Sequence, residues 1–153
     1  MSMSRFSIKY EVSDEGWADI EISDGLDIVR FPASYIYDSL RDLAEMALKL
    51  RKGAREAKAI FMTEPGSFHL MATSDGQTAK YSLRRHRTEK RASDYSVSLE
   101  GNTPVHRIVH QVTQILYNIN QKIGPTRYKE LWRNQEFPTE AFEELHNEPA
   151  KEK

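Results

Sequence analysis

The chain of 153 residues contains no cysteine. This absence excludes disulfide bonds, thiolate metal sites and cysteine nucleophiles, and it is typical of proteins in a reducing compartment. Long apolar runs are missing as well. Residues 1–30 alternate charged and apolar groups, a pattern that predicts neither a signal peptide nor a membrane span. We therefore expect a cytoplasmic protein that does not bind a membrane.

Length and charge narrow the expectations further. A chain of 153 residues suits a single domain with a core of its own. We expect one α+β domain over residues 1–146 and a disordered tail over residues 147–153. The net charge of -1 is distributed unevenly: residues 1–40 carry 8 acidic and 3 basic residues, whereas residues 41–91 carry 6 and 12. Such asymmetry creates local potentials that can select partners.

Alternation of apolar and polar residues predicts several strands. Residues 6–12 and 18–22 alternate on either side of turn-forming residues, which indicates a hairpin with one buried face. A meander of antiparallel strands is expected later in the chain, over residues 57–63, 67–73, 78–86 and around 95–99.

Apolar residues recur at helical spacing in two long segments. After Pro32, the spacing predicts a helix that is capped by Ser34 and ends before Gly53. A second helix is predicted with Thr103 as its cap and Pro104 as its first residue, continuing to the next Gly-Pro pair. Two shorter helices are expected over residues 126–133 and 138–146.

The order of these elements predicts an α+β fold. We expect a mainly antiparallel sheet of five or six strands, with helices packed on one face and the other face open. Trp17, Asp19 and Glu21 are predicted to point outward from the first hairpin. If the later strands are in matching phase, they add to this face Ile60, Met62, His69 and Met71.

Two histidines four residues apart, His106 and His110, have the spacing of a zinc protease helix. That class needs a glutamate after the first histidine and a third metal ligand, whereas Arg107 follows here. The pattern therefore favours histidines at the boundary of an apolar stripe, with metal binding or a titrating contact as alternatives. We predict no metal site.

Other catalytic signatures are missing from the sequence. It contains no nucleophile elbow, phosphate-binding glycine loop or dinucleotide fingerprint, so no catalytic residue and no cofactor are predicted. The lone His69 on an outward strand position is interpreted as structural. A small-molecule enzyme with a site near His69 or His106 is kept as a third hypothesis.

A basic segment near the centre of the chain suggests a different function. Its cations could neutralise phosphates of a nucleic acid, although no aromatic residue lies inside the segment to stack bases. A charged hairpin end that discourages edge pairing is the favoured explanation of this segment. Binding of nucleic acid is therefore the second hypothesis, and it would use Arg84, Arg85, Arg87, Lys90 and Arg91.

The acidic first hairpin supports the main hypothesis, which is that the chain binds a basic protein. Its spacing does not match a calcium loop, so either a solvated strand face or a docking surface for a basic protein is indicated. An outward-facing tryptophan on the same face would provide an apolar anchor for such a partner. The predicted contact residues are Trp17, Asp19, Glu21, Asp24 and Asp27.

Several short segments, taken together, form a pattern that can be compared with other proteins. They are Trp17-Ala18, Ser34-Tyr35, Asp38-Ser39-Leu40, Asp42-Leu43, Gly53 and Glu64-Pro65-Gly66. With these segments the chain resembles small uncharacterised bacterial α+β proteins, some of which are associated with toxin immunity. The pattern consists mostly of capping, turn and core residues, so the resemblance implies a shared fold rather than a shared activity. Together with the acidic hairpin, it suggests a non-catalytic immunity protein that occludes the active site of a basic toxin domain.

Overall fold

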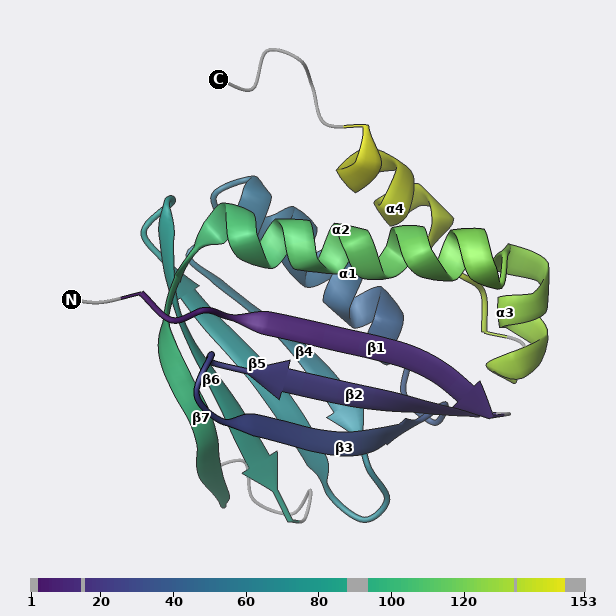
Figure 1. Ribbon diagram of the computed structural model, residues 1–153, viewed down its shortest axis with the longest axis horizontal. Coiled ribbons are helices and arrows are strands. Elements are labelled where there is room, and N and C mark those ends of the chain that lie inside the picture. The colour runs from purple at the N-terminus through teal and green to yellow at the C-terminus, as the bar shows by residue number, and fades with distance from the viewer. Residues whose placement is uncertain (1–2, 15, 88–93, 134, 148–153) are drawn as a thin grey trace.

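The computed structural model describes residues 3–14, 16–87, 94–133 and 135–147, in two antiparallel sheets and four helices (Figure 1). Most of the predicted tail, residues 148–153, lies outside the described residues. The first sheet contains β1 (Ser7–Asp14), β2 (Trp17–Ser23) and β3 (Ile28–Ser34), in that order. The second sheet contains β4 (Glu56–Met62), β5 (Ser67–Ser74), β6 (Thr78–His86) and β7 (Tyr95–Pro104). The helices are α1 (Ser39–Arg51), α2 (Val105–Lys122), α3 (Pro125–Leu131) and α4 (Thr139–His146).

The α+β class and the antiparallel pairing are confirmed, but the expected single sheet of five or six strands is wrong. The described chain forms seven strands in two sheets, and the strand that was not predicted is β3. In β3, the buried Phe31 and Ala33 alternate with the exposed Arg30 and Pro32. Proline is tolerated there because β3 is an edge strand, where the missing N–H removes no ladder hydrogen bond.

Both predicted helix caps are also wrong, because each of the two residues belongs to a strand. Ser34 belongs to β3, and its hydroxyl donates a hydrogen bond to the carboxylate of Glu64. α1 instead begins after Asp38, whose side chain accepts the N–H of Arg41 at 3.3 Å. Thr103 lies within β7, and α2 begins at Val105 without a side-chain cap.

The core lies between the inner faces of the two sheets and the helices. α1 connects the sheets and packs against β4 and α2, while α2 runs alongside β1 (Figure 1). Between the sheets, the rings of Phe31 and Phe68 stack with centroids 4.0 Å apart. A hydrogen bond of 2.8 Å between the hydroxyls of Tyr10 and Ser39 joins β1 to α1. No helix in the described part of the chain is long and apolar enough to cross a membrane.

Candidate functional site

The outer face of the first sheet carries three of the predicted contact residues. Trp17, Asp19 and Glu21 alternate along β2 with residues that are buried in the core. Their predicted outward direction is therefore confirmed. Trp17 is 36% exposed, a large open surface for a tryptophan.

Glu21 is already paired with cations from both neighbouring strands. The register places Lys9 of β1 on one side of it and Arg30 of β3 on the other. Its carboxylate lies 3.6 Å from Nζ of Lys9 and 3.0 Å from Nε of Arg30. This row of the sheet is therefore compensated within the protein and offers little unpaired negative charge to a partner.

The next row of the sheet is different, because it brings two acidic residues together. Glu11 of β1 lies directly opposite Asp19 of β2, and Pro32 of β3 lies on the other side of Asp19. Among the described residues, no cation forms a salt bridge with either carboxylate. Like charges directly opposite each other destabilise a sheet. Glu11 was not among the predicted contacts, although the register of the hairpin would have indicated it.

Trp17 lies at the end of the sheet, where the β1–β2 turn meets the C-terminal part of the chain. The N–H of Gly16 donates to the carbonyl of the last residue of α3 at 2.6 Å, and the N–H of Tyr35 donates to the carbonyl of Gly16 at 2.8 Å. The guanidinium of Arg133 lies 5.2 Å from the centre of the Tyr35 ring. The next residue, Ile36, is 58% exposed. Aromatic residues and arginine are the types that dominate interface hot spots.

Asp24 and Asp27 are not part of this group. They lie in the β2–β3 turn, at the end of β2 opposite to Trp17. The carboxylate of Asp24 accepts the N–H groups of Asp27 and Leu26, both at 2.8 Å. These backbone hydrogen bonds, with that of Asp27 as the larger effect, hold the pKa of Asp24 below its ordinary value. Asp24 therefore has a local role in the turn.

The basic segment is divided by strand alternation. Arg84 and Arg85 are neighbours in β6, so their side chains point to opposite faces of the second sheet. Arg87 is exposed beyond the end of the strand, and Lys90 and Arg91 lie outside the described residues. The structure therefore does not bring the described cations of this segment onto one surface.

The outer face of the second sheet combines rings and a guanidinium. His69 and His86 stack with centroids 3.9 Å apart, and His86 lies 5.2 Å from Tyr95. The guanidinium of Arg84 is 4.6 Å from the centre of the Tyr95 ring. The expected outward residues of the later strands belong to this second face and not to that of Trp17; they are the half-buried Ile60, Met62, His69 and Met71.

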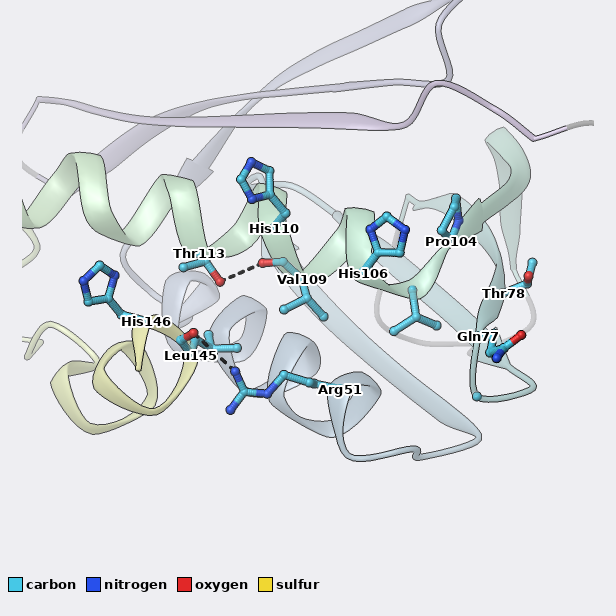
Figure 2. Close-up of a pocket in the computed structure, with 12 residues that line it drawn as sticks. Arg51, Gln77, Thr78, Pro104, His106, Val109, His110, Thr113, Leu145 and His146 are labelled. Atoms are coloured by element: carbon cyan, nitrogen blue, oxygen red, sulfur yellow. Dashed lines mark hydrogen bonds between the residues drawn. The ribbon is translucent and has the colours of Figure 1, made fainter. Parts of the chain in front are cut away.

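His106 and His110 line an open groove of about 820 Å³ between the start of α2, α1 and α4. Figure 2 shows both imidazoles on α2, with His146 contributed by α4. Arg51 of α1 also lines the groove, but it donates to the carbonyl of Leu145 at 3.2 Å. No group of three or more potential ligands that could hold a metal ion occurs in the described chain. No carboxylate lines the groove among the described residues, so a histidine–carboxylate pair for acid–base chemistry is missing there.

Comparison with known proteins does not favour any of these surfaces, so they are compared by their chemistry alone. No protein-family model, curated protein or solved structure matches the chain. The outer face of the first sheet combines an exposed indole with a pair of carboxylates that form no salt bridge with a described cation. Of the surfaces described above, this one has the strongest chemical reason to bind a partner.

Proposed function

We propose that this chain is a non-catalytic binding protein that docks a basic protein partner on the outer face of the first sheet. The observation that carries the proposal is the pair of Glu11 and Asp19, which forms no salt bridge among the described residues and lies on the same face as the exposed Trp17. The partner that fits the sequence resemblance is a toxin domain. The protein would then act as an immunity protein that covers the toxin's active site.

The physical reason is that the free protein tolerates an unfavourable arrangement that a partner can relieve. Two carboxylates on adjacent strands repel each other, and a lysine or arginine from the partner would neutralise both. Complementary charges at the rim of an interface mainly increase the association rate. We therefore assign Glu11 and Asp19 to the attraction of the partner.

Trp17 would have a different part in binding. A partly exposed indole that becomes covered on association typically costs about 2 kcal/mol or more when it is truncated, mostly through faster dissociation. Ile36 and the Arg133–Tyr35 pair lie at the same end of the sheet and would extend the contact. Compared with the predicted contact residues, the proposed set therefore omits Asp24 and Asp27 of the acidic turn. It adds Ile36 and the Arg133–Tyr35 pair around Trp17.

The experiment is a kinetic measurement with a basic toxin domain encoded beside the gene for this chain. Asp19→Lys should lower the association rate at low salt, and Trp17→Ala should raise the dissociation rate. Asp27→Lys is the matched control, because it makes the same charge change at the other end of β2. Equal effects of Asp19→Lys and Asp27→Lys would reject the docking surface, as would unchanged kinetics in folded Trp17→Ala.

A second candidate function has one specific observation in its favour. Arg84 and Tyr95 form a cation–π pair next to the stacked His69 and His86 on the outer face of the second sheet. Single-stranded nucleic acids are bound by such combinations of cations and rings. The divided basic segment makes this the weaker candidate, since Arg85 faces away from that surface.

A further inference from the structure

In the described part of the chain, three of the four sheet edges carry a feature that opposes further strand pairing. Along β1, Gln111 of α2 accepts the N–H of Ile8 at 3.1 Å. Along β4, Asp42 of α1 accepts the N–H of Ile60 at 2.9 Å. β3 contains Pro32, which has no N–H to donate. Helices and prolines of this kind are common means of protecting edge strands from unwanted partners.

The fourth edge, that of β7, is protected in only one of its halves. In the C-terminal half, the N–H of Ser4 donates to the carbonyl of Asn102 at 2.6 Å. Residues 95–98 are instead exposed on both faces of the sheet. In the part of the chain that the structure describes, no hydrogen bond from outside β6 reaches their backbone. Tyr95 is 37% exposed and Val97 is 48% exposed, so this half of the edge is open and also apolar.

The backbone groups that face the open edge follow from the register. Because the carbonyl of Asn102 points outward, that of Glu100, two residues away, does so as well. The register of β6 and β7 then shifts at a bulge opposite Leu83 and Arg84. One extra residue in a bulge reverses the alternation. The N–H and C=O groups of Val97 and Tyr95 therefore point to the open edge.

We infer that a second copy of this chain pairs with this open half of β7, antiparallel and about a two-fold axis at Ser96. In that register, Tyr95 lies opposite Val97 of the second copy, and the two residues exchange backbone hydrogen bonds. The same pair occurs twice because of the symmetry. Both side chains lie on the outer face, where an aromatic and a β-branched residue form a favourable cross-strand pair.

A second copy suits this edge because the segment is complementary to itself. Residues 95–98 carry no charge, and Asp94 comes to lie opposite Ser98 of the second copy, so no like charges meet. The interface is isologous and closed, as in most soluble homodimers. Pairing would join the two four-stranded sheets into one continuous sheet of eight strands and would cover Tyr95 and Val97.

The natural chain has no cysteine, so single cysteine substitutions test the register directly. For Ser96→Cys, the two Cα atoms across the axis would be about 4.5 Å apart, within the range that a disulfide bridges. For the control Ser98→Cys, the two positions would be displaced by four residues along the strands, roughly 13 Å. Under the same mild oxidation, we expect Ser96→Cys to form disulfide-linked dimers at least tenfold faster than Ser98→Cys.

Equal rates for the two variants, or no dimer from Ser96→Cys, would overturn the inference. The second outcome includes the case in which the strand of a different protein normally occupies this edge. A further substitution, Val97→Lys, places a charge at the centre of the paired surface. In the double variant, Val97→Lys should slow the formation of the Ser96→Cys dimer severalfold. The melting temperature of the double variant should stay close to that of Ser96→Cys alone. The comparison of positions 96 and 98 decides the question even if Val97→Lys fails to fold.

Discussion

Neutralising Asp19 should make the free protein more stable. Its carboxylate lies opposite that of Glu11, with no cation of the described chain paired to either. Two unit charges about 5.5 Å apart in water repel each other by about 0.8 kcal/mol. Cross-strand charge pairs typically contribute about 0.2–1 kcal/mol. We therefore expect Asp19→Asn to raise the free energy of unfolding by about 0.5 kcal/mol at low ionic strength.

Urea denaturation at low ionic strength and in 1 M NaCl would measure this effect. In 1 M salt the screening length falls to about 3 Å, so the gain from Asp19→Asn should largely vanish. Glu21→Gln is an informative control with the opposite sign, because it removes ion pairs to Lys9 and Arg30. Asp27→Asn should change little. A loss of stability for Asp19→Asn at low salt, or a gain that is equal in both salts, would refute the reasoning.

Three further predictions concern other parts of the molecule. We expect little binding of single-stranded DNA or RNA at micromolar protein; a salt-sensitive shift abolished by Arg84→Ala would favour the second candidate function. Protein purified without an affinity tag should contain no stoichiometric zinc, and zinc lost in His110→Ala would contradict this. Burial, and secondly the hydrogen bond to Asp42, raise the pKa of Tyr37 to about 12 from 10.0. Because the folded state holds this proton more tightly, the associated stability is complete below pH 10.0 and is lost toward about pH 12. Tyr37→Phe should flatten the loss of stability over that interval, as measured by urea denaturation.

Much of the secondary structure could be predicted because its periodicity is local. The β1–β2 hairpin follows from alternation over residues 6–22, and α2 follows from an apolar stripe at helical spacing. β3 was missed because Pro32 was interpreted as the boundary before a helix. The alternation of Phe31 and Ala33 with exposed neighbours was present in the sequence. Proline excludes a central strand but not an edge strand, and strand order cannot be obtained from local periodicity.

The side-chain directions at the candidate site were predictable, but the charge balance was not. Alternation along β2 places Trp17 and Asp19 on one face without knowledge of any neighbour. Whether an acidic residue is compensated depends on the strands beside it, and therefore on register. Register decides that Glu21 is paired with Lys9 and Arg30, while Asp19 is opposite Glu11.

The excess of acidic residues in the first 40 positions therefore does not by itself define a docking surface. Several of these residues have local functions: Glu21 forms ion pairs, Asp24 closes a turn and Asp38 caps α1. Such carboxylates already have partners within the protein, so a binding partner would have to compete with these contacts. Asp19 and Glu11 have no such contacts in the described chain, and a basic partner would remove their repulsion as it binds. An acidic residue that costs stability in the free protein is thus a better indicator of a binding surface than the total charge of its segment.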